Sequence, residues 1–547
     1  MTLREQIKVF FKGDVDDDAA TLEAHSRDAS IFRLRPRLVV FPKDVVDICN
    51  LVKFVRKQKE EGHHISLTAR AAGTDMSGGP LTTSIAMVCT RYLNRIKEVG
   101  DDYAVVEPGM YYRDFEAETL KSGLLMPSYP ASRELCAVGG MVANNSGGEK
   151  TLAYGKVENY VRQVRMVLDD GEEYPFAPMT LGELEAKKRQ HTVEGDVYRK
   201  LAKLVFDHSR ELQQAKPQVS KNSTGYSLWN VWDAERSVFD PTKVIVGSQG
   251  TLGIITEITF RLVRPKVHSR MLVVYLRSLE PLVQIVNRVL RYKPESFESY
   301  DDHTFRMELK LFPQLVRHLR GNIFSLAWQF LPEFKMMLMG GIPKMVLIAE
   351  FTAGSAAEAE AQARKAEESV RSLGCKTKVT HSEDEGVKYW VMRRESFNVL
   401  RQQVHGLRTA PFIDDFVVRP DVLPKFLPQL YKILDQHKIV YTVAGHVGDG
   451  NFHIIPLMDM TRPESLTVIK KLSRQVYELV FQFKGSMSGE HNDGLIRGPY
   501  LEEMYGEKVY SLFVETKNIF DPLGIFNPGK KTGVNISYTM AHVDTRA

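Results

Sequence analysis

The sequence predicts an α+β protein that folds into more than one domain, and three observations support this prediction. The chain has 547 residues, more than a single hydrophobic core usually serves. Its first half alternates short apolar runs with helical patterns, and several of these runs lead into glycine-rich loops. Its second half holds further apolar strands and one Ala/Glu-rich helix, a pattern typical of a sheet covered by helices. We therefore expect a cleft between two folded units.

The first unit is predicted from residue 38 and closes near Arg264. Short β-rich runs bounded by turn residues indicate strands, and longer amphipathic runs indicate helices. The expected strands are Leu38–Phe41, Ile65–Ala69, Ala104–Glu107, Val161–Leu168, Val244–Val246 and Ile254–Leu262, and the expected helices are Val45–Lys59 and Tyr112–Lys121.

The second unit is predicted to be a sheet with one open face that the first unit or helices must cover. Met271–Leu276 and Met345–Phe351 are apolar runs of strand length. Ala356–Arg371 has the composition of an exposed amphipathic helix. The boundary between the two units is the expected position of the site.

Composition excludes several classes of protein. The net charge is +5, from 73 basic and 68 acidic residues, which is too small a surplus to predict nucleic acid binding. The four cysteines form no C-x-x-C pair, so neither a thiolate zinc site nor an iron-sulfur site is expected. The first residues lack a signal-peptide pattern, and no run of about 18 apolar residues occurs. We expect a cytoplasmic protein.

Three glycine-rich loops are the first candidate binding elements. Residues 70–79 follow a predicted strand, and their glycines would let backbone amides approach a phosphate. The spacing fits neither the Rossmann pattern nor the P-loop pattern, and a tight strand connection is the alternative. Residues 138–148 and 246–253 are similarly rich in glycine and small side chains, which makes simple turns a weaker explanation for all three.

Two further loops concentrate histidine and carboxylate. His446 and His453 are seven residues apart, but the intervening glycines disfavour helix, so we predict a turn followed by a strand over Phe452–Pro456. Glu490 and His491 lie in another glycine-bounded loop. Imidazole and carboxylate ligands suit zinc, manganese or iron(II). Hydrogen bonding to buried backbone, or exposure to solvent, is the alternative for these histidines.

The three glycine loops resemble the flavin-binding loops of the vanillyl-alcohol oxidase superfamily. The resemblance implies extended FAD with its diphosphate on the first loop. No histidine or cysteine stands in that loop, which favours noncovalent FAD, although Cys136 lies beside the second loop. Gln249 stands where the family usually has glutamate. The residues expected to bind FAD are Arg70, Ala71, Ala72, Gly73, Thr74, Asp75, Ser77, Gly78, Gly139, Gly140, Ala143, Asn145, Gly148, Gly253, Ile255 and Asn527.

The histidine loops resemble the carboxyl-terminal region of FAD-linked D-lactate, glycolate and D-2-hydroxyglutarate dehydrogenases. The resemblance implies zinc or manganese bound by His446, His453 and Glu490, with His491 as the base. One departure is Asn492-Asp493, where many members have glycine.

The same resemblance implies the domain organisation. We expect a two-part FAD-binding domain of the vanillyl-alcohol oxidase (PCMH) type over residues 1–265 and a substrate or cap domain over 266–510, with an antiparallel sheet covered by helices. Residues 511–547 are expected to return to the FAD domain.

The implied reaction is oxidation of a small D-2-hydroxy acid, such as D-lactate, to the 2-oxo acid. Hydride would pass to flavin N5, while the metal and His491 would activate the hydroxyl group. The substrate carboxylate is expected to bind arginine. Arg393 is the first candidate, with a role in catalysis, and Arg394 and Arg408 are the others. A family lysine has no match near Asp414-Asp415, which argues against a second substrate carboxylate.

The electron acceptor is left open between oxygen, a quinone and a redox protein. Leu309–Val346 is apolar and basic, which suits either peripheral contact with the inner membrane face or packing within the second domain. Two rival functions use the same fold: a non-redox FAD transferase of the alkylglycerone-phosphate synthase type, and a flavin subunit of a larger electron-transfer complex. A homo-oligomer is compatible with the sequence.

Overall fold

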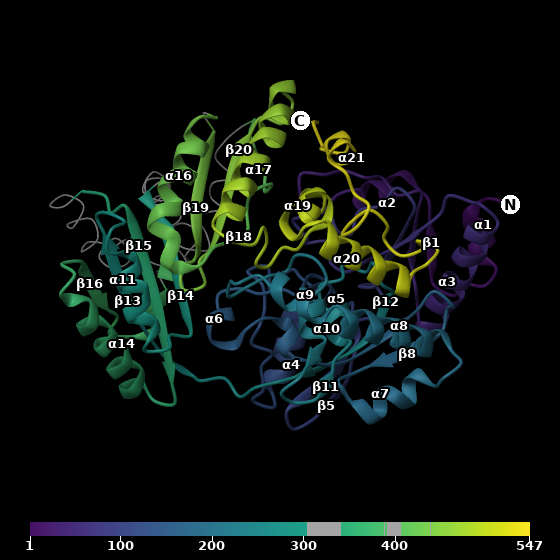
Figure 1. The fold of residues 1–547 in the computed structure, drawn as a ribbon, viewed down its shortest axis with the longest axis horizontal. Helices are drawn as coiled ribbons and strands as arrows, with labels where there is room; N and C mark the ends of the chain where they lie inside the picture. The colour runs from purple at the N-terminus through teal and green to yellow at the C-terminus, as the bar shows by residue number, and fades with distance from the viewer. Residues whose placement is uncertain (303–340, 388, 391–405, 438, 547) are drawn as a thin grey trace.

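A computed structural model describes residues 1–302, 341–387, 389–390, 406–437 and 439–546 of the chain. Figure 1 shows a lobe built from the N-terminal half, in purple to blue, beside a lobe built around one large sheet, in teal to green. The C-terminal segment, in yellow, lies on the first lobe. Mixed helices and sheets therefore confirm the predicted α+β class.

The first sheet contains three parallel strands with one antiparallel strand at its edge. Helix α3 (Val45–Glu60) connects two of the parallel strands; the Asp44 carboxylate caps its first turn by accepting from the amide of Asp47. Its apolar face, including Leu51 and Val55, is fully buried. In spatial order the strands are β1 (Asp14–Asp16), β2 (Leu38–Phe41), β4 (Ile85–Val88) and β3 (Leu67–Arg70).

The second sheet is antiparallel and forms the other half of this lobe. Its strands in spatial order are β5 (Ile96–Val99), β6 (Tyr103–Val106), β12 (Ile254–Arg261), β7 (Val161–Val167) and β8 (Glu173–Phe176). Helices α4 (Tyr112–Leu120), α5 (Val138–Asn144) and α8 (Val193–Asp207) share its hydrophobic core. A small third sheet holds β10 (Trp232–Asp233), β11 (Val238–Phe239) and β9 (Met179–Thr180), followed by α7 (Leu181–Lys188).

One strand prediction is wrong. Val244–Val246 was expected to be extended, but Thr242–Ile245 forms the short helix α10. The Asp240 carboxylate accepts from the amide and the hydroxyl of Thr242, which favours a helical turn at this point. A short apolar run fits a buried helix as well as a strand, so periodicity alone did not separate them.

The second lobe is built on an eight-stranded antiparallel sheet. Its strands in spatial order are β16 (Lys376–Val379), β13 (His268–Leu276), β15 (Met345–Ala353), β14 (Ser296–Asp301), β19 (Val440–His446), β20 (Asn451–Met458) and β17 (Arg408–Thr409), and β18 (Phe416–Val417) also pairs with β20. The core contains side chains from α11 (Leu282–Leu290), α14 (Ala356–Arg371), α16 (Leu423–Asp435) and α17 (Pro463–Gln482).

Helix α14 has the bounds that the sequence predicted, and small side chains explain how it packs. Ala359, Ala363 and Ala366 are fully buried on one face, so the helix axis can approach β13 and β15 closely. The other face carries glutamate and lysine. The predicted antiparallel sheet with helical cover is therefore present in the described chain.

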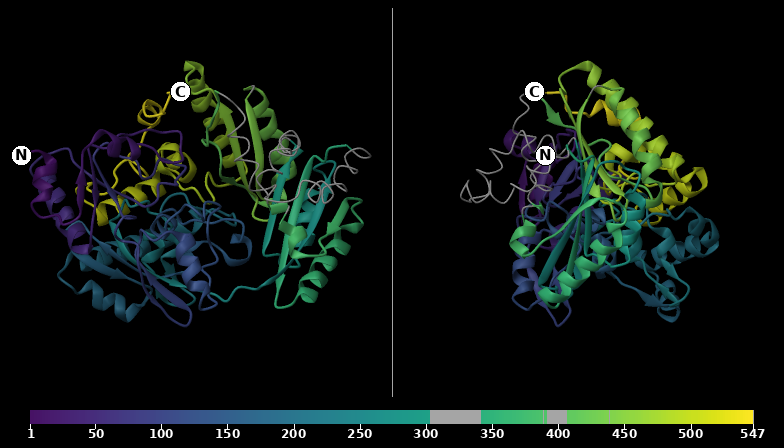
Figure 2. Two further views of the ribbon diagram at one scale, coloured as in Figure 1. Left: turned by 180° about the vertical axis from the view of Figure 1, so that it is seen from behind. Right: turned by 90° about the vertical axis from the view of Figure 1, so that its left-hand side faces the viewer.

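The C-terminal segment packs against the first lobe (Figure 2). Helix α20 (Glu507–Phe520) contributes Phe513 and Phe520 to the core of the second sheet. Phe526 then pairs in parallel with Leu67 of β3. Shorter helices of the described chain are α1 (Leu3–Lys8), α2 (Ala19–Ala24), α6 (Thr151–Tyr154), α9 (Ser209–Ala215), α18 (Gly494–Arg497), α19 (Leu501–Tyr505) and α21 (Ile536–Ala541).

Some predictions fall outside the described residues. Most of Leu309–Val346 lies outside them, so its membrane contact and its packing within the second domain both stay predictions. Arg393 and Arg394 also lie outside the described residues. Among the helices that the structure does describe, none is both long enough and apolar enough to cross a membrane.

Candidate functional site

The hairpin of β19 and β20 positions the two histidines. His446 is the last residue of β19, and Ala444 of the same strand pairs with His453 of β20. Gly450 in the turn has a φ of +68°, and a Cβ there would lie 1.8 Å from the carbonyl oxygen of Val418. Only glycine fits this position. The predicted turn followed by a strand is confirmed, and the turn brings both imidazoles to one side.

His446, His453 and Glu490 come together in a buried cluster. Nε2 of His446 lies 3.3 Å from Oε1 of Glu490, and Nε2 of His453 lies 4.0 Å from Oε2. One ligand atom from each of the three residues lies within 4.8 Å of the other two. All three residues are more than nine-tenths buried. This spacing and donor set fit a divalent cation such as zinc or manganese.

Hydrogen bonds on the far side of each ring fix the orientation of the imidazoles. Nδ1 of His446 lies 2.6 Å from the Glu298 carboxylate, and Nδ1 of His453 donates to the carbonyl oxygen of Asp414 at 2.8 Å. Each Nε2 is therefore left to face Glu490. Partners of this kind are typical of histidines that bind metals, because they select the tautomer and hold the ring.

Burial and charge shift the pKa values in the cluster in different directions. Burial lowers the pKa of His453 to about 4. Burial also lowers the pKa of His446, but the carboxylates of Glu298 and Glu490 outweigh it and raise the value to about 9. Burial opposes ionisation of Glu490, whereas Lys221 and His446 hold its pKa well below the usual value. The carboxylate is therefore charged in a site that excludes most water.

His491 lies beside the cluster on the same loop as Glu490. Its Nδ1 is 2.7 Å from Oδ2 of Asp414, and the other carboxylate oxygen of Asp414 accepts from Arg497. Asp414 and Arg497 are fully buried. This pair holds the imidazole so that Nε2 is the nitrogen available for proton transfer. The neighbouring carboxylates, Asp415 first, outweigh burial and raise the pKa of His491 to about 9.

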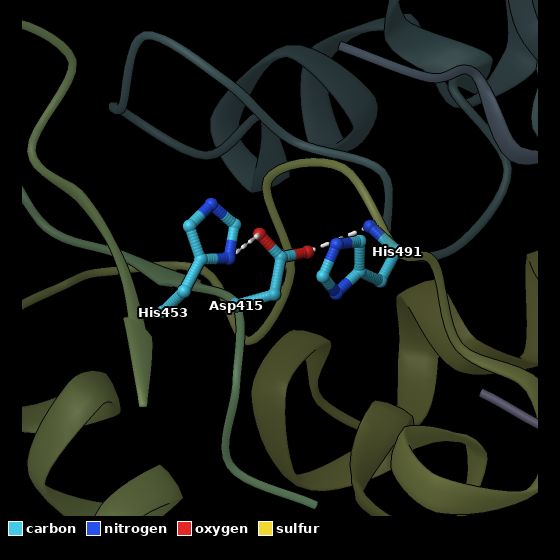
Figure 3. A group of neighbouring side chains, drawn as sticks. All are labelled: Asp415, His453 and His491. Carbon is cyan, nitrogen blue, oxygen red and sulfur yellow. Dashed lines mark hydrogen bonds and ion pairs between the residues drawn. The ribbon is translucent and has the colours of Figure 1, made fainter. Parts of the chain in front are cut away.

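Asp415 holds together the backbone around these histidines (Figure 3). Its Oδ2 accepts from the amides of Glu490 at 2.8 Å and His491 at 2.7 Å and from the Ser488 hydroxyl at 2.6 Å. Figure 3 shows Asp415 between His453 and His491, and these three also lie close enough to suggest a second metal group. Because Asp415 already accepts several N–H and O–H bonds, we interpret it as support for the loop.

Lys221 is a residue of the site that sequence analysis missed. Its side chain is fully buried, with Nζ 2.7 Å from Glu490 Oε1 and 3.2 Å from Asp449 Oδ2. Burial lowers the pKa of Lys221, but Asp449 and Glu490 outweigh it and raise the pKa well above the ordinary value. The ammonium is therefore charged at neutral pH. A single lysine in a polar segment of sequence does not indicate that its side chain will be buried beside Glu490.

The first glycine loop fits an anion. Within the part of the chain that the structure describes, the amides of residues 72–76 donate no hydrogen bond, whereas Asp75 accepts from the amides of Ser77 at 3.0 Å and Gly79 at 2.8 Å. The buried Nη1 atom of Arg70 has no partner among the described residues. Asp75 thus shapes the loop, while its free amides and the arginine can face a diphosphate, as FAD requires.

The second glycine cluster departs from the expected loop, because residues 138–144 form helix α5. A Cβ at Gly139 would lie 2.6 Å from the Pro108 carbonyl oxygen, and one at Gly148 would lie 2.2 Å from that of Tyr129. Close packing within the protein therefore explains these two glycines. Gly140 instead faces Ala71 of the first loop. Contact of Gly139, Gly140, Ala143, Asn145 and Gly148 with FAD stays a prediction.

Two side chains bind the glycine loops to one another. The Asn527 amide donates to the carbonyl oxygens of Gly79 at 2.9 Å and Gln249 at 2.7 Å. Gln249, which departs from the family's glutamate, donates to the Ser77 hydroxyl at 3.0 Å and accepts from the amide of Gly494 at 2.8 Å. The amide group of glutamine serves both as donor and acceptor here. Gly253 and Ile255 continue into β12, where their contact with FAD stays a prediction.

Asn492, the other departure, occupies a backbone position suited to glycine. Its φ is +68°, a region that asparagine tolerates better than most residues. Its side-chain amide donates to the carbonyl oxygens of Asn144 at 3.2 Å and Gly247 at 2.9 Å, and its Oδ1 accepts from Lys531 at 2.5 Å. The side chain therefore joins the His491 loop to the second and third glycine clusters.

Glu490 also approaches the second glycine cluster directly. A Cβ placed on Gly147 would lie 3.3 Å from Oε1 of Glu490. The histidine cluster is thus adjacent to the predicted flavin-binding surface.

Two other expectations have a structural outcome. Arg408 donates to the carbonyl oxygen of Arg546 at 3.2 Å and lies 3.6 Å from Asp544, so its guanidinium is engaged by the C-terminal residues. Cys136 is buried, and burial raises the pKa of its thiol to about 12. A thiol of this kind is a poor nucleophile, which favours noncovalent flavin.

Two family models match separate parts of the chain. The model "FAD binding domain" matches residues 36–175, and the model "FAD linked oxidases, C-terminal domain" matches residues 265–531. In both regions the chain is similar to FAD-linked oxidases. The C-terminal match contains both histidine loops, and the N-terminal match contains the first two glycine clusters.

Similar proteins share the family and differ in length. The chain is 26% identical over 526 residues to D-2-hydroxyglutarate dehydrogenase of Pseudomonas putida, covering 95% of this chain and 50% of that protein. It is 24% identical over 501 residues to D-lactate dehydrogenase of Archaeoglobus fulgidus, covering 90% of both chains. It is 23% identical over 537 residues to glycolate oxidase subunit GlcD of Bacillus subtilis, covering 96% of both. The chain spans about half the length of the first relatives it matches.

Solved structures support the fold assignment alone. p-Cresol methylhydroxylase with substrate bound superposes with a TM-score of 0.66 at 14% identity, covering 97% of this chain and 96% of that chain. Alkyldihydroxyacetonephosphate synthase gives a TM-score of 0.65 at 14% identity, covering 96% and 85%. The predicted vanillyl-alcohol oxidase type of fold is confirmed.

Proposed function

We propose that this protein is an FAD-linked oxidoreductase that oxidises a small D-2-hydroxy acid to the 2-oxo acid. The observation that carries the proposal is the buried His446, His453 and Glu490 cluster, with His491 on the same loop and the second glycine cluster adjacent. Relatives named as dehydrogenases or oxidases of D-2-hydroxyglutarate, D-lactate and glycolate support the substrate class.

The residues named above would hold two groups. Arg70 and the free amides of residues 72–76 would bind the FAD diphosphate, and FAD when bound supplies an acceptor for a hydride. His446, His453 and Glu490 would hold a divalent cation, zinc or manganese, which when bound polarises the substrate hydroxyl. Both Nδ1 atoms are already committed to other partners, so the ligand atoms need no rearrangement of the rings.

His491 would act as the base. Asp414 orients the ring through Nδ1, which leaves Nε2 for the hydroxyl proton of the substrate. To accept that proton the imidazole must be neutral, although the two aspartates favour its charged form. A positive charge beside the ring opposes this effect and lowers the pKa of His491. Proton acceptance and cation binding are therefore coupled in this site.

The oxidation removes one proton and one hydride from the substrate. The O–H proton goes to His491, and the α-hydrogen leaves with its electron pair, so the C–O single bond becomes the C=O bond of the 2-oxo acid. Arg393, with Arg394 as a further candidate, would bind the substrate carboxylate; the guanidinium of Arg408 is already engaged by Asp544 and Arg546. Electrons would then pass to oxygen, a quinone or a redox protein.

Reduction of the flavin without oxygen tests the proposal. The purified FAD-loaded protein would be mixed with D- and L-2-hydroxy acids, before and after chelation, while the visible flavin band is recorded. We expect one class of D-acid to bleach the band, chelation to prevent bleaching, and manganese or zinc to restore it. His491→Gln should keep FAD but slow bleaching by about 10² to 10⁴. His63→Gln, in an exposed turn, is the matched control. A yellow wild-type protein that no acid bleaches would contradict the proposal.

A further inference from the structure

Three carboxylates and one ammonium group are buried together around the imidazoles of His446 and His453. Glu298, Asp449 and Glu490 are each less than one-tenth exposed, and the side chain of Lys221 is not exposed at all. A histidine nitrogen must lose its proton to bind a metal, and with both imidazoles neutral in this way the four groups carry a net charge of −2. Buried charges must be compensated locally, because the protein interior screens them weakly.

The neighbouring charged groups have partners of their own. Asp414 and Asp415 face Arg497 and His491. Lys156 donates to the carbonyl oxygens of Asn222 and Gly489, which carry no charge, so its ammonium and the guanidinium of Arg497 together balance Asp414 and Asp415. The Glu298 carboxylate contacts Nδ1 of His446, on the side of the ring away from Glu490. The charge left to be compensated is therefore concentrated at the cluster itself.

Lys221 shares one oxygen atom with the proposed cation site. Oε1 of Glu490 lies 2.7 Å from Nζ of Lys221 and 3.3 Å from Nε2 of His446. Any cation held by that carboxylate would feel the ammonium at short range. We propose that Lys221 sets the charge of this site, so that the three carboxylates are neutralised by one lysine together with a cation of charge +2. Lys221 is thus a specificity-determining residue for a divalent ion.

This inference rests on the metal site of the proposed function, and it leads to a quantitative expectation. Replacing Lys221 by methionine removes one positive charge, whatever the protonation of its neighbours. The gain in electrostatic attraction is proportional to the charge of the bound ion, so a trivalent ion gains more than a divalent ion. Coulomb attraction over a few ångströms, at the effective dielectric constant of a protein, predicts a change in selectivity of about 10- to 100-fold.

The FAD-loaded protein would be stripped of metal, and dissociation constants for Mn²⁺ and Gd³⁺ would be measured by water proton relaxation. In Lys221→Met the Kd ratio should shift toward Gd³⁺ by at least about tenfold. Lys221→Arg, which keeps the charge, is the matched control and should leave the ratio near that of wild type. The ratio separates charge from orientation, because a misplaced Glu490 would weaken both ions together.

Asp449 provides the opposite change. Asp449→Asn removes one negative charge 3.2 Å from the same ammonium, so its ratio should shift toward Mn²⁺. The double variant Lys221→Met/Asp449→Asn restores the charge balance and should return the ratio toward wild type. If Lys221→Met does not fold with FAD, the Asp449→Asn shift still tests the inference.

Two results would overturn it. Equal weakening of both ions in Lys221→Met would mean that the lysine only orients Glu490, and an unchanged ratio in Asp449→Asn would mean that the buried charge does not select the ion. If the wild-type protein binds neither ion, the metal site of the proposed function fails first, and this inference fails with it. A wild type that binds Mn²⁺ but variants without any shift would leave the proposed function intact.

Discussion

Replacement of Asn492 tests how the histidine loop is joined to the glycine clusters. The side-chain amide makes two hydrogen bonds to carbonyl oxygens, each worth about 1 kcal/mol, and accepts one charge-assisted bond from Lys531, worth about 1.5 to 3 kcal/mol. Lys531 keeps Asp493 as a second partner, so the smaller value applies. Asn492→Gly should therefore reduce the free energy of unfolding by about 3.5 kcal/mol. Asn492→Ala should cost about 1 kcal/mol more, because alanine is strained at φ +68°.

Urea unfolding followed by circular dichroism and flavin fluorescence would measure both variants. Ser237 is the matched control, because it is exposed with a φ of +52° and lacks the buried side-chain bonds. There, glycine should be as stable as serine or more stable. An Asn492→Gly protein as stable as wild type would refute the role of the side-chain bonds. An Asn492→Ala protein no less stable than Asn492→Gly would refute the backbone argument.

Three further predictions follow from single positions. Gly450→Ala should prevent correct folding of the hairpin, measured as loss of soluble FAD-loaded protein, because the added Cβ would meet the Val418 carbonyl oxygen at 1.8 Å. Burial, with a contribution from Asp75, raises the pKa of Asp28 from 3.8 to about 7. Protonated Asp28 therefore stabilises the folded protein fully below about pH 4, and this stabilisation is lost as the pH rises through 7. Asp28→Asn should make the unfolding midpoint less dependent on pH across that window. Acid precipitation should release all flavin from wild type and Cys136→Ser alike, and flavin retained in the wild-type pellet alone would contradict noncovalent binding.

The sequence predicted the regular elements well where their pattern is local. The strand Leu38–Phe41 and the helix Ala356–Arg371 have the predicted bounds, because each is bounded by residues that end or cap it. The error at Val244–Val246 arose where an apolar run is too short to have a period. Domain boundaries at 265 and 510, and the FAD and substrate contacts, stay predictions.

The candidate site was only partly predictable, for a different reason. His446, His453, Glu490 and His491 lie in glycine-bounded loops that mark them in the sequence. The groups that complete the site, such as Lys221, come from distant segments without a local signal. A buried lysine is stable only beside acids that the fold brings to it, so its role depends on tertiary contacts that no window of sequence contains.

Asp414 and Asp415 show how adjacent residues of one type acquire separate tasks. Successive side chains of an extended chain point in opposite directions, and these two precede strand β18. Asp414 therefore reaches His491 and Arg497, whereas Asp415 accepts from the backbone of the Glu490 loop. Asp414→Asn should disturb the orientation of the His491 base while the Glu490 loop stays folded. Asp415→Asn should loosen the loop itself. Comparing metal affinity in Asp414→Asn and Asp415→Asn distinguishes the two tasks, because only the second change should release Glu490 from its position.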